Sequence, residues 1–292
     1  MERELWKELY QLAEALDKSV RRGLYRASCI VSVYFWAVVH DRPVSWACDG
    51  KNWPSDGVFP AWYLPSQPTM SRRLRTTAVE QLLLAIEEEI SEAAWTYVVW
   101  VKMIDAKPLP VSAYSKDPDA AWGRGAGKSQ KGYKFYAIWE QRPLPSAWAL
   151  APMNVAEVRL GKELVKDLPG GGYLLGDKQY DASPMFDAAG KNNHQLVAPR
   201  KQKGKALGHR RNSPFRIRSI ELLKTAFGRA LFKERTQIER QFGNWTAFGS
   251  GLAPLPAWVR RFHRVRLWVH AKLLINALRI QRLRPVRTLA VA

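Results

Sequence analysis

The sequence predicts a mixed α/β fold, in which a helical N-terminal region precedes a mixed sheet that is covered by helices. The hydrophobic period changes near residue 95, from helical spacing to strand-like alternation. Beyond that point, strands joined by tight turns are followed by strand–helix–strand alternation, which is typical of a mixed sheet flanked by helices. With 292 residues, the chain can hold one large domain and a smaller helical one.

The N-terminal region, residues 1–94, is expected to be helical. Its third helix begins at Ser66, and its first turns expose Arg72 and Arg73. Such a helix is either a DNA-recognition helix or an amphipathic helix whose solvent-exposed face is basic, and the sequence pattern does not distinguish the two. The expected elements of this region are helices over 2–18, 22–39 and 66–90, with irregular chain over 41–65.

The second region, residues 95–283, is expected to form the sheet and its covering helices, and 284–292 is expected to be a tail. A strongly basic stretch over 200–218 is predicted to be a loop. The expected strands cover 96–104, 108–114, 132–140, 146–152, 172–176 and 195–199, and the expected helices cover 155–168, 183–190, 219–247 and 257–283.

The composition points to a polyanionic partner. The chain has 46 Lys and Arg residues against 26 Asp and Glu, a formal charge of +20, and basic side chains gain affinity for phosphate by releasing counterions. Two cysteines without metal-ligand spacing argue against a disulfide framework and fit a reducing cytoplasm. The longest apolar run, residues 28–39, is too short to span a bilayer. A soluble cytoplasmic protein is therefore expected.

Three carboxylates stand at the ends of separate predicted elements. Asp105 and Asp177 each follow a strand-like run, and Glu239 lies on a helix among arginines. A lone aspartate after a strand is usually a turn former or a cap. Carboxylates that gather at strand ends, however, bind hard divalent cations, and such cations activate phosphodiesters. The sequence therefore predicts a candidate metal site that acts on nucleic acid.

The helix that carries Glu239 has a distinctive face. Phe232, Arg235, Glu239 and Thr246 are spaced three, four and seven residues apart, which places them on one side of a continuous helix. On that face Arg235 is able to bind a phosphate group or to orient the side chain of Glu239. A surface Arg–Glu pair one turn apart has the same spacing, so spacing alone leaves both interpretations open.

Other motifs carry less chemistry. Asp117 and Asp119 are predicted turn residues, and Asp181 is predicted to cap the next helix. Residues 123–129 end like a phosphate-binding loop, but they lack its leading glycine, and a strand follows where a helix is needed. They are interpreted as a flexible basic loop that touches DNA.

Five segments in a fixed order resemble the DDE transposases of bacterial insertion sequences, of the insertion-sequence four/five type, whose catalytic domain is RNase H-like. The resemblance covers roughly residues 95 to 283. The segments are I-D-A-K-P-L-P-V, D-P-D-A-A-W-G-R-G-A-G-K-S-Q-K-G-Y-K-F-Y, G-D-K-Q-Y-D, V-A-P-R-K and R-T-Q-I-E-R-Q-F.

The resemblance implies an RNase H-like fold and a DNA transposase that cuts element ends and joins them to target DNA. By position, Asp105, Asp177 and Glu239 are the implied catalytic residues and hold two Mg²⁺ ions, for which Mn²⁺ can substitute. The N-terminal region is expected to bind the element ends, and a homodimer associated with the nucleoid is expected to pair them. The expected DNA-binding residues are Arg72, Arg73, Lys128, Lys131, Lys134, Arg200, Lys201, Arg235 and Arg240.

Three positions depart from the family pattern. Gln179 stands where a glycine is usual, Phe232 replaces a tyrosine, and Thr246 replaces a lysine. The two helix changes remove possible contacts to DNA. A catalytically decayed, transposase-derived DNA-binding protein and a general RNase H-like nuclease are therefore the alternative functions.

Overall fold

The computed structural model describes residues 2–19, 24–55, 57–59, 63–92, 99–125, 127–202, 207, 212–246 and 251–283. The chain forms two compact units: Met1–Trp95 together with Gly249–Ala292, and Thr96–Phe248. The sequence placed residues 249–283 in the second region, whereas they pack with the N-terminal helices. Residues 284–292, the predicted tail, lie outside the described residues.

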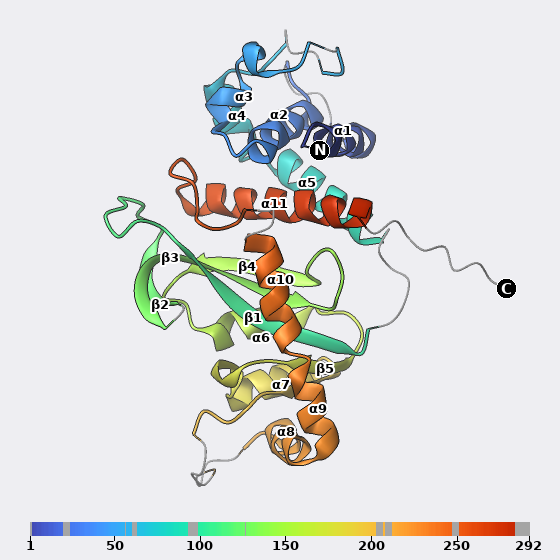
Figure 1. Cartoon of the computed structure of the whole chain (residues 1–292), viewed down its shortest axis with the longest axis vertical. Coiled ribbons are helices and arrows are strands. Elements are labelled where there is room, and N and C mark those ends of the chain that lie inside the picture. Colours follow the sequence, from blue (N-terminus) through green and yellow to red (C-terminus); the bar gives the residue numbers. More distant parts are fainter. Residues whose placement is uncertain are drawn as a thin grey trace, which may run out of the picture. The chain divides into compact units, whose positions relative to one another are not determined.

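The first unit is all helical in its described part. The helices predicted over 2–18 and 22–39 are present, but the one predicted from residue 66 is split in two at residues 74–76. The stretch over 41–65 also contains short helical turns. The unit comprises α1 (Glu2–Leu16), α2 (Ala27–Val39), α3 (Val44–Ala47), η1 (Gly50–Asn52), α4 (Gln67–Arg73), α5 (Thr77–Glu92) and α11 (Phe262–Leu283) (Figure 1).

The core of this unit forms around α2, which is buried along nearly its whole length. Trp6 of α1 lies edge-on to Trp36 and Trp53, with ring centroids 5.3 Å apart in both pairs. Ion pairs join α11 to the other helices: Arg282 lies 2.7 Å from Glu8. None of the described helices is both long and apolar enough to cross a membrane.

The second unit is a mixed sheet with helices on its faces. Its strands are ordered β2-β3-β1-β5-β6, and β4 pairs with β3. β1 pairs antiparallel with β3 and parallel with β5. The elements are β1 (Val101–Pro110), β2 (Ala121–Gly125), β3 (Lys128–Trp139), β4 (Ala147–Pro152), α6 (Glu157–Lys166), β5 (Gly172–Leu175), η2 (Lys178–Tyr180), α7 (Ser183–Lys191), β6 (His194–Val197), α8 (Pro214–Lys224), α9 (Ala226–Lys233) and α10 (Thr236–Thr246).

β1 is one strand where the sequence predicted two. It continues through Asp105 to Pro110, so Asp105 lies within the strand and no turn follows it. The Val111 N–H donates to the Lys131 carbonyl of β3 at 2.9 Å. Because successive N–H groups alternate in direction, the nitrogens of Pro108 and Pro110 face away from β3, along the edge that β5 leaves unpaired. Residues 96–98 of the first predicted strand lie outside the described residues.

Alternate residues of β1 and β3 face opposite sides of the sheet. Ile104, Tyr136 and Ile138 belong to an apolar core with residues of α6 and α7. On the other face, Phe135 contacts Phe242 of α10. Asp105 pairs with Ala137, so its side chain is on the α10 face.

Two further predictions on this unit were wrong. The predicted helix over 219–247 is three helices. Thr225 caps α9 by accepting from the Gly228 N–H at 2.9 Å, and a Cβ on Gly228 would collide with the Leu222 carbonyl oxygen. The loop predicted over 123–129 is the hairpin of β2 and β3, registered by pairs such as Arg124 with Ser129. The helices predicted over 155–168 and 183–190 are present as α6 and α7, and α8 begins within the stretch that was predicted to be a loop.

Candidate active site

Asp105 lies within β1, and Asp177 lies two residues beyond the end of β5, the parallel neighbour of β1. β1 and β5 pair as Val101 with Tyr173 and Met103 with Leu175. The side chains are near enough that the Asp177 carboxylate raises the pKa of Asp105. The two aspartates therefore lie within electrostatic reach of each other, and their joint role as metal ligands stays a prediction.

The environment of Asp105 disfavours its negative charge. Burial raises its pKa to about 7, and the carboxylates of Asp177 and Glu157 act in the same direction. The Ala106 N–H, which donates to Asp105 Oδ1 at 2.8 Å, and the nearby Arg235 oppose that shift. A partly buried carboxylate beside like charges is stabilised by a cation at this point.

Arg235 connects Asp105 to Glu239. Its Nη1 lies 3.4 Å from Asp105 Oδ2, and its Nη2 lies 2.6 Å from Glu239 Oε1. Glu239 itself is 56% exposed. Because one guanidinium contacts both carboxylates, the pair is more than the surface Arg–Glu pair that the spacing left open. The site carboxylates thus come from β1, from the end of β5 and from α10.

Aromatic packing positions α10 over this face of the sheet. Phe242 and Trp245 of α10 have ring centroids 5.8 and 5.6 Å from that of Phe135 on β3, and 5.4 Å from each other. Figure 1 shows α10 crossing in front of the strands. These contacts hold the helix whose first turn carries Glu239.

Phe232 and Thr246 do not extend the face that carries Glu239. Phe232 belongs to α9, which ends before Arg235, so the continuous helical face predicted for these residues is wrong. Thr246 Oγ1 donates to the Phe242 carbonyl at 2.7 Å within α10.

The segment G-D-K-Q-Y-D gives its two aspartates different tasks. Asp177 accepts from the Gln179 N–H at 2.7 Å and begins the turn η2. Asp181 was predicted to cap the next helix, but Ala182 occupies that position. Asp181 instead accepts from Arg216 Nε at 2.7 Å and from its Nη2 at 3.0 Å, and so ties this turn to α8. Asp181 is buried and structural, whereas Asp177 is part of the site.

Glu157 is a fourth carboxylate near the site, and sequence reasoning did not single it out. It begins α6, acts on the pKa of Asp105, and pairs with Lys134 Nζ at 3.2 Å. An acidic residue in the first turn of a helix is common, so the sequence carried no signal for this placement. The pairing buries Lys134, which was predicted to contact DNA, to 8% exposure.

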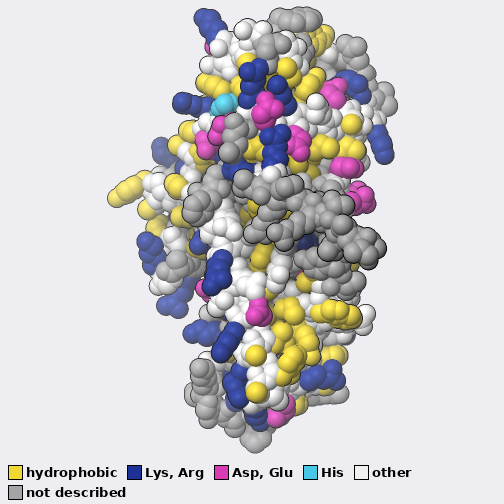
Figure 2. All heavy atoms as spheres, turned by 45° about the vertical axis from the view of Figure 1, so that its right-hand side comes forward, with side chains coloured by type: hydrophobic (Ala, Val, Ile, Leu, Met, Phe, Trp, Pro, Cys, Tyr) yellow, Lys and Arg dark blue, Asp and Glu magenta, His cyan; other side chains and the backbone are white. Residues whose placement is uncertain are grey.

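The remaining predicted DNA contacts fall into two groups. Lys128, Lys201 and Arg240 are exposed in the second unit, as is Arg72 in the first. Lys131 is half-buried and donates to the Ser115 carbonyl at 2.7 Å, and Arg73 and Arg200 are also half-buried. Lys and Arg side chains are spread over the face displayed in Figure 2, so charge alone does not trace a DNA path.

The described residues contain no group of three His, Cys, Asp or Glu side chains that is already gathered as a metal site. In this arrangement Arg235 supplies the positive charge between Asp105 and Glu239. The donor set itself consists of carboxylate oxygens, which are the ligands that Mg²⁺ prefers. The residues therefore fit a hard divalent cation once Arg235 moves away from one carboxylate.

A sheet in which antiparallel strands are continued by two parallel strands, with helices on its faces, is consistent with an RNase H-like fold. The fold class predicted from the sequence is thus confirmed. Residues 100–275 match the family of transposase DDE domains. This match covers more than half of the chain, and the protein therefore belongs to the DDE transposase family.

One solved structure and the curated proteins complete the comparison. The chain is similar to a chain in the cryo-EM structure of a piggyBac transposase synaptic complex with hairpin DNA, with 10% sequence identity and a TM-score of 0.41. The likeness covers 96% of this chain and 72% of that chain. A TM-score this low does not establish a shared function. None of the curated proteins matches the chain.

Proposed function

We propose that this protein is a DNA transposase that cleaves the ends of an insertion sequence and joins them to target DNA by direct transesterification. The observation that carries the proposal is the nearness of Asp177, just after β5, to Asp105 on β1, with Arg235 linking Asp105 to Glu239. Membership of the DDE transposase family supports the reaction class.

In this proposal Asp105, Asp177 and Glu239 hold two Mg²⁺ ions, or Mn²⁺ in their place. Bound metal ions supply activation of the attacking oxygen and stabilisation of the leaving oxygen of the phosphodiester. The rigid strand pair fixes the two aspartates, and the aromatic contacts of α10 fix the approach of Glu239. Movement of Arg235 from carboxylate to phosphate places its two N–H donors on the DNA backbone.

Exposed basic residues contribute the sequence-independent contacts. Lys128, Lys201 and Arg240 lie exposed in the second unit, and Lys and Arg side chains at such positions bind backbone phosphate. The first unit, with Arg72 exposed on α4, is proposed to bind the element ends. We also propose that the protein acts as a homodimer that pairs two element ends and that it is associated with the nucleoid. Within its family we assign it to the insertion-sequence four/five type.

The test is metal-dependent cleavage and joining on the DNA that flanks the gene. The wild type is compared with Asp177→Asn, and with Asp181→Asn as the matched control from the same turn. Cuts at the element ends that require Mg²⁺ and vanish only in Asp177→Asn support the proposal. Equal cutting by the wild type and Asp177→Asn would refute it.

A catalytically decayed DNA-binding protein is the second candidate. It is favoured by the contact of Arg235 with both Asp105 and Glu239 and by the absence of an assembled metal cluster among the described residues. It predicts specific binding to the element ends without strand cleavage at any Mg²⁺ or Mn²⁺ concentration. A nuclease without end specificity would cut the same DNA at many positions and join nothing.

A further inference from the structure

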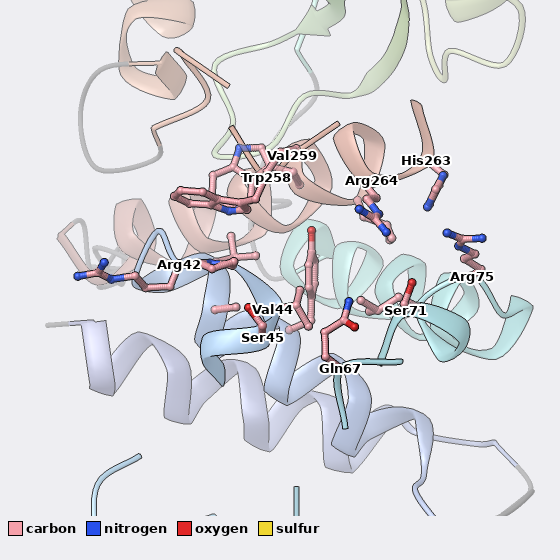
Figure 3. A pocket seen from close by; sticks show the side chains of 17 residues that line it. Arg42, Val44, Ser45, Gln67, Ser71, Arg75, Trp258, Val259, His263 and Arg264 are labelled. Carbon is pink, nitrogen blue, oxygen red and sulfur yellow. The ribbon is translucent and has the colours of Figure 1, made fainter. Parts of the chain in front are cut away.

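The first unit contains a cavity that lies among α2, α4 and α11 and the chain just before α11. Its volume is about 470 Å³, which is within the range of small-molecule sites. Its lining includes Arg42, Arg75 and Arg264, together with Trp258 and Gln67. Figure 3 shows Arg75 and Arg264 at one end of the cavity and Arg42 at the other.

The charge of this cavity is one-sided. None of its lining residues is acidic, and among the described residues Arg42, Arg75 and Arg264 form no ion pair. By contrast, two other basic side chains of the same unit have acidic partners: Arg266 lies 2.9 Å from Glu80, and Lys272 pairs with Asp41. Three unmatched guanidinium groups around one hollow favour an anion with more than one phosphate oxygen.

The wall of the cavity suits an aromatic base. The ring of Trp258 is 42% exposed although it lines the cavity, and an exposed indole face stacks on a base of any sequence. The Gln67 amide and the Ser71 hydroxyl face the same space from α4 (Figure 3), and such groups both donate to and accept from base edges. Apolar residues form the rest of the lining.

We propose that this cavity is a nucleoside-phosphate site, in which Trp258 stacks on the base and Arg75 and Arg264, at one end of the cavity, bind phosphate. Two sources supply this chemistry: a free nucleotide, or an unpaired nucleotide of DNA. The DNA source rests on the proposed function and deepens it, because it would give the helical unit a contact that duplex DNA alone does not offer. The free-nucleotide source stands without it.

The test uses the full-length protein carrying Asp105→Asn, without divalent metal, so that binding is measured apart from strand cleavage. The probes are deoxynucleoside 5′-monophosphates, a duplex with one unpaired nucleotide, and the same duplex fully paired. Trp258→Ala is expected to weaken binding of the nucleotide, or to reduce the preference for the unpaired duplex, by about 5- to 150-fold. Arg75→Gln is expected to lower the slope of log affinity against log salt by about one.

Two control variants separate the cavity from general effects. Arg266→Gln removes an exposed arginine of α11 that pairs with Glu80 outside the cavity, and Trp100→Ala removes a tryptophan that is 66% exposed in the other unit. Both are expected to bind the probes as the wild type does.

Binding of the nucleotide, or preferential binding of the duplex with an unpaired nucleotide, that falls with Trp258→Ala and Arg75→Gln but not with the controls supports the proposal and identifies the source. Absence of both nucleotide binding and this preference, or values that the cavity variants leave unchanged, overturns it. If the wild type binds the nucleotide but does not cleave DNA, the proposed function is refuted and the nucleoside-phosphate site is not.

Discussion

The two faces of the sheet in the second unit are built from the same strands but have different roles. On one face, Ile104 lies in an apolar core with α6 and α7, and every member of that core is buried. On the other face, the next residue, Asp105, lies near two carboxylates and one arginine. Because successive residues of β1 face opposite sides of the sheet, Ile104 stabilises the core while its neighbour Asp105 carries a charge that burial disfavours.

This difference shows where the molecule can bear like charges. The core under α6 and α7 keeps the strand pair rigid. The opposite face can therefore hold Asp105 close to Asp177, although burial raises the pKa of Asp105 to about 7. Charges that a fold holds together without neutralising them are typical of functional sites. Neighbouring positions should therefore respond to substitution in opposite ways.

The largest expected effect follows from Asp105→Asn. Strand cleavage should fall below detection because the variant removes a charged metal ligand, while DNA binding is retained. The free energy of unfolding in the absence of metal should stay equal or rise, because a carboxylate disfavoured by burial is lost. Cleavage assays and urea unfolding measure both quantities. Retained cleavage would remove Asp105 from the catalytic set.

Ile104→Ala, one residue away, should show the reverse behaviour. We expect the free energy of unfolding to fall by about 2–5 kcal/mol, because the substitution leaves a cavity in the closed core. The folded fraction of the variant should still cleave DNA in the presence of Mg²⁺. If this variant were as stable as the wild type, the contrast between the two faces would fail.

Asp181→Asn separates the two aspartates of the η2 turn. Asp181 is buried and accepts two hydrogen bonds from Arg216, so we expect a loss of about 1–3 kcal/mol in the free energy of unfolding. Cleavage by the folded protein should persist, unlike that of Asp177→Asn. Thermal unfolding together with the cleavage assay checks both parts, and a silent Asp181→Asn would show that the tie to α8 carries little stability.

The smallest expected effect concerns Arg235→Gln. Removal of the guanidinium leaves Asp105 and Glu239 without a counter-charge, so affinity for Mn²⁺ should increase on the order of ten-fold. Arg240→Gln, an exposed neighbour on α10, should not change it. Calorimetric titration distinguishes the two variants. Weaker Mn²⁺ binding by Arg235→Gln would mean that Arg235 orients the carboxylates and does not compete with the metal.

The order of strands and helices, and the meeting of Asp105 with Asp177, could be predicted because both follow from local patterns and parallel pairing. The continuity of β1 through Pro108 could not, because it depends on which edge of the strand is left unpaired. Asp181 looked like a cap because its true partner, Arg216, is 35 residues away. The glycines over 123–129 likewise indicated a loop, whereas pairing joins β2 to the first residues of β3; the rest of β3 was predicted as the strand over 132–140.

The central claim is that Asp105 and Asp177 form one metal-binding pair, and binding of Mn²⁺ followed by electron paramagnetic resonance tests it most directly. If they do, the wild type and Asp181→Asn bind Mn²⁺ alike, while Asp105→Asn and Asp177→Asn each bind at least about ten-fold more weakly. Equal Mn²⁺ binding by the wild type and Asp177→Asn would show that the two aspartates do not form such a pair.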